Sequence, residues 1–464
     1  MLLLMILLLP LTFPVFAEQK IAKGQLTDPV RSAFDPQQTH AVYLPSQYAV
    51  EKRWPVLFCF DARGDGKVPV ELFREAAERL GWIILSSNHS RSDDAGAKNL
   101  EVLKAMWSDA HKWFSLDDRR IYATGFSGGA RLAWGTGYIF PDSIAGVIGV
   151  GAGMHEERPP SRSTTFVWYG ITGNKDFNYL EVKKLDRQLA ALQIPRRVAH
   201  FDGFHDWPPP EHCSRALDWM ELQAMKRQKR AKDDAWVLER FNRQRAEAAG
   251  LERSLKQFAA FEKYTHLKED FEGLLDLGDI PDRVSELAGS EIVKKELAEQ
   301  RKLEEKEERL QKAFLQTLDA FSVSSEIPFA RKLRADLNIS RLQNEAKEKG
   351  EASYEGLMLQ RVLEGIFAQT SFYLPQYFFE KKNFDSALVS LAIASEIHPD
   401  APGIWYRMAI AHIHQGDKKR VLENLKMAID RGLNNRKWID EEKSFDPIRN
   451  DPAFQQLLTK IPPQ

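Results

Sequence analysis

The stretch from Ile121 to Ala130 carries the residues best suited to chemistry. It reads IYATGFSGGA, an apolar run of strand-forming residues that leads into the pentapeptide GFSGG at residues 125–129. In a G-x-S-x-G pattern the serine lies on a sharp, strained turn between a strand and a helix, and the glycines let these two elements approach closely. The hydroxyl group is left exposed. The pattern therefore predicts Ser127 as a nucleophile.

A serine hydroxyl becomes a good nucleophile only when an imidazole accepts its proton and a carboxylate orients that imidazole. Two turn-rich loops that follow strand-like runs, TFVWYG and RVAHF, supply these groups. The first loop carries Asp176, which we predict as the acid, and the second carries His205, which we predict as the base. Asp202 and Asp206 flank His205, but they share its tight loop and are poorly placed to reach its Nδ1 atom.

The negative charge that develops on an attacked carbonyl oxygen needs backbone N–H donors. Gly128 follows the nucleophile directly and is the first expected donor. The second is expected from the loop after the strand-like run PVLFCF, where Ala62 and Arg63 are the candidates.

Other polar residues are expected near the same edge of the sheet. The segment SSNHSR at residues 86–91 follows the run WIIL, and it either contacts substrate or is an ordinary polar loop. We interpret His155 as a solvent-exposed loop residue. His200 lies within a strand-like run, and we expect it to be packed in the sheet.

Three ordered motifs carry a resemblance to a known family. Roughly residues 20–225 resemble the α/β-hydrolase superfamily, and within it the secreted esterases similar to polyhydroxybutyrate depolymerases, feruloyl esterases and dienelactone hydrolases. The motifs are GFSGGA for the nucleophile, GNKDFNY for the acid and GFHDWP for the histidine. The sequence departs from these relatives after the third strand, where they commonly have His-Gly and this chain has Asp61 and Ala62. The resemblance implies an α/β fold with a doubly wound, mostly parallel sheet, hydrolysis of a carboxylic ester and no cofactor.

Composition limits the other classes of function. The chain has 464 residues, 43% hydrophobic and 28% charged, which is ordinary for globular protein and allows about three domains. A net charge of -1 argues against a nucleic-acid partner. The two cysteines, Cys59 and Cys213, allow one disulfide bond at most, and we favour Cys59 as a buried core residue. The Cys and His pattern does not suggest a metal site.

The N-terminal residues 1–17 read MLLLMILLLPLTFPVFA and precede the polar Glu18. The run is typical of a secretory signal with cleavage after Ala17, although the usual basic residues before the apolar core are missing. An uncleaved membrane anchor is the alternative, and no later stretch is apolar enough to cross a bilayer. We therefore predict an exported protein, periplasmic or secreted, whose α/β-hydrolase domain covers residues 20–228.

The composition changes after about Lys226, where Lys, Glu, Ala, Leu and Arg dominate and indicate helices. We predict a helical spacer at residues 229–345 that packs against its neighbours. Residues 346–464 resemble tetratricopeptide repeats, since a shift of about 34 residues superimposes small and apolar positions. The superimposed pairs are Leu391 with Leu425, Ala394 with Ala428 and Phe378 with His412. The resemblance implies a protein partner.

These observations predict an exported serine esterase joined to an interaction module, with a small-molecule or polymeric ester as substrate. Two alternatives remain: a hydrolase fold that has lost activity and acts as a binding or scaffold protein, and a peptidase or polyester depolymerase. Since Ser127, Asp176 and His205 all precede Lys226, we expect the sheet domain alone to keep most of its activity on small soluble esters.

Overall fold

The computed structural model describes residues 20–92, 96–155, 157–324 and 327–461. The expected signal segment, residues 1–17, lies outside the described residues. None of the helices that the described residues form is both long enough and apolar enough to pass through a membrane.

The described N-terminal residues form an eight-stranded sheet with the order β1-β2-β4-β3-β5-β6-β7-β8. Strand β2 runs antiparallel to both of its neighbours, and the strands from β4 to β8 are parallel. The strands are Leu26–Arg31 (β1), Thr39–Tyr43 (β2), Trp54–Phe60 (β3), Ile83–Ser87 (β4), Leu116–Phe126 (β5), Ile144–Val150 (β6), Val167–Gly173 (β7) and Arg196–Phe201 (β8).

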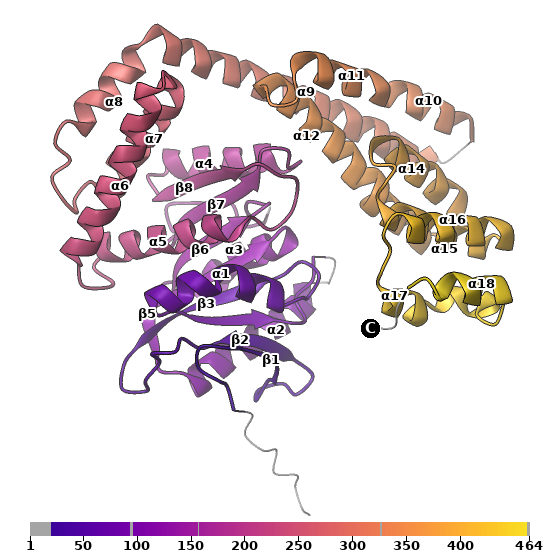
Figure 1. The fold of residues 1–464 in the computed structure, drawn as a ribbon, viewed down its shortest axis with the longest axis horizontal. Helices are drawn as coiled ribbons and strands as arrows, with labels where there is room; N and C mark the ends of the chain where they lie inside the picture. Colours follow the sequence, from indigo (N-terminus) through magenta and orange to yellow (C-terminus); the bar gives the residue numbers. More distant parts are fainter. Residues whose placement is uncertain (1–19, 93–95, 156, 325–326, 462–464) are drawn as a thin grey trace, which may run out of the picture.

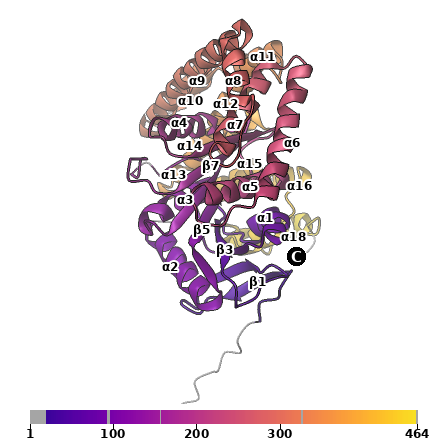
Figure 2. The same cartoon turned by 90° about the vertical axis from the view of Figure 1, so that its left-hand side faces the viewer.

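Helices cover both faces of this sheet, as Figure 2 shows most clearly. The helices are Lys67–Leu80 (α1), Gly96–Trp113 (α2), Gly128–Ile139 (α3), Tyr179–Ala191 (α4) and Pro210–Lys226 (α5). Helices α1 and α5 pack on one face, and α2, α3 and α4 pack on the other. Strand β3 shows that both faces of the sheet are covered, because Phe58 belongs to one core and Leu57 to the other. All of the residues of β3 are buried. Strands buried on both faces read as continuous apolar runs. The predicted doubly wound α/β fold is confirmed.

The two cysteines are free, and both are buried in the core under α1 and α5. The possible disulfide bond is therefore absent, and Cys59 is a small core residue as we favoured.

The chain continues from α5 into a helical region, as the change in composition predicts. Its helices are Asp234–Arg253 (α6), Gln257–Phe271 (α7), Ile280–Gly289 (α8), Glu291–Ser324 (α9), Ile327–Leu337 (α10), Ile339–Lys349 (α11), Tyr354–Ala368 (α12), Leu374–Glu380 (α13), Phe384–Ile397 (α14), Pro402–His414 (α15), Lys418–Asp430 (α16), Arg436–Glu441 (α17) and Pro452–Leu458 (α18). A π-helical turn, Gln369–Tyr373, links α12 to α13, and a 3₁₀ turn, Lys443–Ile448, precedes α18.

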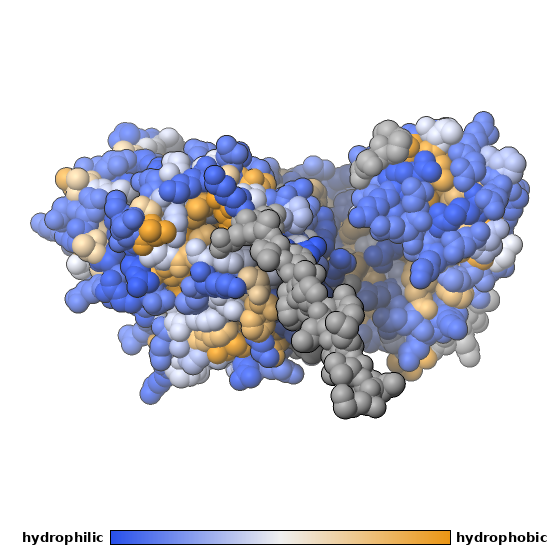
Figure 3. All heavy atoms as spheres, turned by 90° about the horizontal axis from the view of Figure 1, so that it is seen from below, coloured by the Kyte–Doolittle hydropathy of each residue, from blue (hydrophilic) through white to orange (hydrophobic). Residues whose placement is uncertain are grey.

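Figure 1 shows the course of these helices around the sheet domain. Helices α6 to α8 rise from α5, α9 crosses above α4, and α12 to α18 descend on the opposite side as an arm. Figure 3 shows the molecule hollowed between the arm and the sheet domain. The helical region has apolar cores of its own, one around α9 to α14 and another around α15 to α18.

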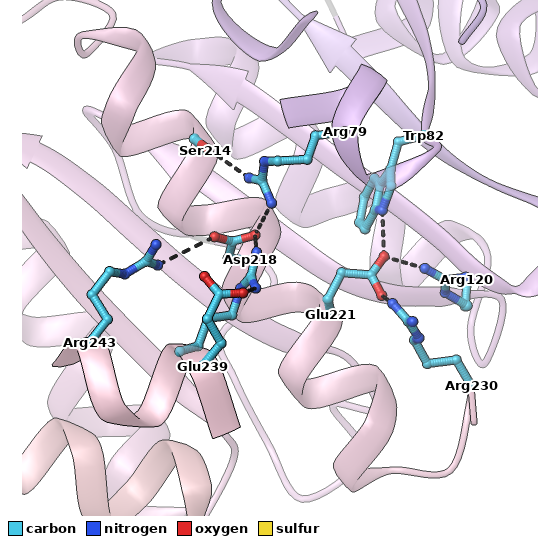
Figure 4. Close-up of polar contacts among 10 residues, drawn as sticks. Arg79, Trp82, Arg120, Ser214, Asp218, Glu221, Arg230, Glu239 and Arg243 are labelled. Atoms are coloured by element: carbon cyan, nitrogen blue, oxygen red, sulfur yellow. Dashed lines mark hydrogen bonds and ion pairs between the residues drawn. The ribbon is translucent and has the colours of Figure 1, made fainter. Parts of the chain in front are cut away.

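Two carboxylates on α5 tie the helical region to the sheet domain (Figure 4). Asp218 pairs with Arg79 of α1 at 2.8 Å and with Arg243 of α6 at 3.9 Å. Glu221 is fully buried and pairs with both Arg120 and Arg230. A buried carboxylate is stable only when its oxygens are satisfied in this way. The junction between α5 and α6 is therefore fixed.

Candidate active site

Ser127 lies in a strained turn between β5 and α3. Its backbone has φ 54° and ψ −119°, in a region that residues other than glycine seldom adopt. The Ser127 amide donates to the Val150 carbonyl at 2.8 Å, which holds the turn against the neighbouring strand. Such strain persists only where the surrounding structure enforces it, and it is common at functional sites.

The glycines around Ser127 allow three elements to converge. A Cβ atom on Gly129 would lie 2.0 Å from the Phe60 carbonyl oxygen at the end of β3. A Cβ on Gly125 would lie 2.2 Å from the Gly129 carbonyl oxygen. Any larger residue at either position would push β3, β5 and α3 apart.

The structure brings together the three side chains that the motifs predict. The Ser127 Oγ atom lies 3.0 Å from His205 Nε2, and His205 Nδ1 lies 2.9 Å from Asp176 Oδ1. Ser127 follows β5, Asp176 follows β7 and His205 follows β8, so all three lie beyond the carboxyl ends of parallel strands. The side chain of Asp176 is fully buried, whereas that of His205 is 19% exposed.

The acid loop and the histidine loop are bonded to each other. The Asn174 amide donates to the Phe201 carbonyl at 2.9 Å, and the Lys175 amide donates to the Gly203 carbonyl at 3.0 Å. The Asn174 side chain accepts a hydrogen bond from the Gly203 amide at 3.2 Å. The position of either loop therefore depends on the other.

Contacts within the loops set the orientations of Asp176 and His205. Asp176 Oδ1 also accepts from the Asn178 amide at 2.8 Å. The His205 ring packs beside Phe126 and Phe177, with ring centroids 4.7 Å and 4.3 Å away. The imidazole thus packs against two aromatic side chains while its nitrogens face the serine and the carboxylate.

The alternative acids point elsewhere. Asp202 is 79% exposed and pairs with Lys175 at 3.2 Å. Asp206 accepts a hydrogen bond from the Trp207 amide. Neither has a hydrogen bond to His205 among the described residues.

For the two other histidines, the exposure in the structure agrees with the sequence-based expectation in one case and not in the other. His155 is exposed on its loop, as expected. The expectation that His200 is packed in the sheet is wrong, because its side chain is exposed and borders a cavity of about 1280 Å³. The cavity lies beside β8, an edge strand, and α6 and α7 form its far wall.

The candidate oxyanion donors lie around the same turn. Gly128 is the first residue of α3, where backbone N–H groups have no partner within the helix. The Arg63 amide donates to the Asp61 carboxylate at 2.8 Å and is therefore engaged. No described residue accepts a hydrogen bond from the amide of Ala62, which makes Ala62 the better of the two candidates.

Asp61 and Trp207 are site residues whose roles the sequence did not suggest. Asp61 is buried, and its second carboxylate oxygen accepts a hydrogen bond from the Trp207 indole at 2.8 Å. This bond connects the loop after β3 with the histidine loop. The sequence signal was that Asp61 stands where the esterases that the chain resembles commonly have histidine. This difference did not indicate Trp207 as the partner of Asp61.

The polar segment at residues 86–91 supports neighbouring loops. Ser87 Oγ accepts from the amides of His89 and Ser90, and Ser90 Oγ donates to the Asp61 carbonyl at 2.9 Å. Ser92 lies next to Gly128, since a Cβ atom on Gly128 would be 2.3 Å from Ser92 Oγ. These contacts agree with the ordinary-loop interpretation of the segment, and Ser92 is a neighbour that the motifs missed.

No group of three or more His, Cys, Asp or Glu side chains in the described part of the chain could hold a metal ion.

Comparisons with known proteins give structural neighbours only. No family model matches the chain, and no curated protein matches it. Among solved structures, S-formylglutathione hydrolase from Staphylococcus aureus is 16% identical, with a TM-score of 0.36, over 43% of this chain and 98% of that chain. A ferulic acid esterase is 19% identical, with a TM-score of 0.34, over 42% of this chain and 95% of that one. The chemistry of the site has to be inferred from its own geometry.

Proposed function

We propose that the protein is a serine hydrolase that cleaves carboxylic esters through an acyl-enzyme intermediate. The observation that carries this proposal is the continuous hydrogen-bonded series from Ser127 through His205 to Asp176, with heavy-atom distances of 3.0 Å and 2.9 Å. A serine in this arrangement can lose its proton to the imidazole as it attacks a carbonyl carbon. The strained backbone at Ser127 supports the same interpretation.

The reaction follows from the positions of these groups. His205 Nε2 accepts the proton of Ser127 Oγ as the Oγ–carbon bond forms, and Asp176 stabilises the resulting imidazolium. The amides of Gly128 and Ala62 donate to the developing oxyanion, and one such donor is worth about 10²–10³-fold in kcat. His205 then gives its proton to the departing alcohol oxygen. A water molecule, activated by the same histidine, releases the acid and restores the serine.

We also retain three finer expectations as proposals. Residues 1–17 direct export, residues 20–228, 229–345 and 346–464 follow one another as a hydrolase unit and two helical units that share the core around α9 to α14, and the last unit binds a protein partner. In support of the repeats, Leu391, Ala394, Leu425 and Ala428 are all fully buried in the arm, as repeat positions that pack paired helices should be.

Replacement of the nucleophile tests the proposed activity. We expect Ser127→Ala to lower kcat on a soluble ester by about 10⁶-fold, because the loss of a serine nucleophile disables the whole group of residues. The melting temperature should stay nearly unchanged, since the substitution removes only one hydroxyl group and its hydrogen bond to His205. Substantial ester turnover by the variant would contradict the proposal.

A further inference from the structure

One arginine of the helical region donates a hydrogen bond to the acid loop. Arg361 lies on α12, and its Nη1 atom donates to the Asn174 carbonyl oxygen at 3.0 Å. Its guanidinium carbon lies 4.2 Å from the centre of the Tyr179 ring. Asn174 and Tyr179 bracket Asp176 in the sequence, so the arginine holds both ends of the segment that carries the acid.

Arg361 is itself held in a fixed direction by α9. Glu307 binds it with both carboxylate oxygens, to Nε at 2.9 Å and to Nη2 at 2.6 Å. The Glu307 side chain is fully buried, and that of Arg361 is 8% exposed. A two-pronged pair of this kind fixes the plane of the guanidinium as well as its position. The remaining Nη1 atom is then aimed at Asn174.

The contact continues from Asn174 to the histidine loop. The backbone amide of Asn174 donates to the Phe201 carbonyl, and the side-chain oxygen of Asn174 accepts from the Gly203 amide. A displacement of Asn174 would therefore move both the loop of Asp176 and the loop of His205.

Helix α12 also approaches the ring that flanks His205. A Cβ atom on Gly365 would lie 2.8 Å from the Phe314 ring and 3.9 Å from Phe177 Cβ. Phe177 in turn packs against His205. The glycine thus allows α9 and α12 to pack closely at a point directly behind Phe177.

We propose that Arg361 is a positioning residue of the active site, and that α9 and α12 complete the site instead of serving as a separate spacer. This inference rests on the proposed esterase function. It reverses the expectation that the sheet domain alone keeps most of its activity, because that fragment would lack both Arg361 and the helix that orients it.

The test must remove the contact without leaving a buried charge, since a single partner of a buried pair is strongly destabilising when left alone. We therefore choose the full-length double variant Arg361→Met with Glu307→Leu, because apolar residues of similar volume often replace a buried ion pair without loss of stability. The matched control is Glu308→Gln, which removes an exposed ion pair between α9 and Lys184 of α4.

We expect kcat of the double variant on a soluble ester to fall about 10²-fold with KM unchanged, because small misplacements of reacting groups have this cost. The acidic limb of kcat against pH should move to lower pH, since a misaligned carboxylate stabilises the imidazolium less. The rate of fluorophosphonate labelling should fall with kcat. The control should match the wild type in all three measurements.

A folded double variant with wild-type kcat and labelling rate would overturn the inference. If that variant does not fold, Arg361→Lys decides, because lysine keeps a cation beside Glu307 but lacks the planar fork that also reaches Asn174. We expect Arg361→Lys to lose kcat with KM unchanged, and wild-type kcat in this variant would equally overturn the inference. Failure of the wild type to label at Ser127 would instead remove the proposed function itself.

Discussion

The sheet domain and the helical region reach the candidate active site by different means. In the sheet domain the backbone places the reacting groups, with Ser127 held at φ 54° and glycines permitting the close approach of β3, β5 and α3. In the helical region a buried side chain, Arg361, donates the hydrogen bond to the acid loop and depends on Glu307 for its direction. The first arrangement is local to a few residues, whereas the second needs two helices and a loop to be in place together.

This difference predicts how substitutions in each region affect stability and activity. A change in the backbone-built part should distort the fold around the nucleophile and lower stability as well as activity. A change that replaces both Arg361 and Glu307 with apolar residues should leave the fold intact and cost alignment of the reacting groups. Variants of the two kinds can therefore be told apart by measuring melting temperature beside kcat.

The largest expected effect in this comparison falls on the acid and the base. We expect Asp176→Asn and His205→Ala each to lower kcat by about 10³-fold or more, because the three groups act as a unit. Asp202→Asn and Asp206→Asn are matched controls on the histidine loop and should keep nearly normal activity. Near-normal kcat in Asp176→Asn would move the acid role to one of these neighbours.

A second prediction compares two glycines on the same helix. Gly129→Ala places a Cβ 2.0 Å from the Phe60 carbonyl oxygen, whereas Gly135→Ala meets nothing within 4 Å. We expect Gly129→Ala to destabilise the protein by about 1–3 kcal/mol or more and to abolish labelling of Ser127. Gly135→Ala should stabilise by up to about 1 kcal/mol through helix propensity. Thermal unfolding measures both, and equal melting temperatures would contradict the close-packing account.

The smallest effect concerns an ion pair within the arm that lies beside the histidine loop. His398, at the end of α14, binds Glu364 at 2.6 Å, and its ring lies 6.2 Å from that of Phe204. The hydrogen bond to Glu364 raises the pKa of His398 above its usual 6.5, although partial burial opposes this.

Because the folded protein favours the protonated form, this stabilisation should be complete below about pH 6.5 and lost as the pH rises through the raised pKa. The pair is partly exposed, so the effect should be no more than about 1 kcal/mol. The difference in melting temperature between wild type and His398→Gln should therefore shrink from pH 5.5 to pH 9. A difference that stays constant over this range would contradict the assignment.

The parts of the site that the sequence predicted are those with local signals. Ser127 lies in a pentapeptide whose glycines are required by the turn, and Asp176 and His205 follow apolar runs that could be assigned as strands. Their order along the chain was enough to place them together at the carboxyl ends of the strands of a parallel sheet. The mostly parallel fold was predictable for the same reason, because strands such as β3 are unbroken apolar runs.

The remaining parts depend on contacts that leave no local pattern. Arg361 and Asn174 are separated by 187 positions, and nothing in the sequence near either residue indicates the other. The bond between Asp61 and Trp207 spans 146 positions and was missed for the same reason. His200 was misjudged because a strand-like run does not reveal that its strand lies at the edge of the sheet. Side-chain contacts between distant elements need the three-dimensional arrangement.

The central claim is that Ser127 is an activated nucleophile, and covalent labelling tests it most directly. The full-length wild-type protein is treated with a fluorophosphonate, and the adduct is located by intact mass and peptide mapping. We predict a single adduct on Ser127, which forms much more slowly in Asp176→Asn and is absent in Ser127→Ala. An adduct on another serine, or no adduct on well-folded protein, would contradict the account.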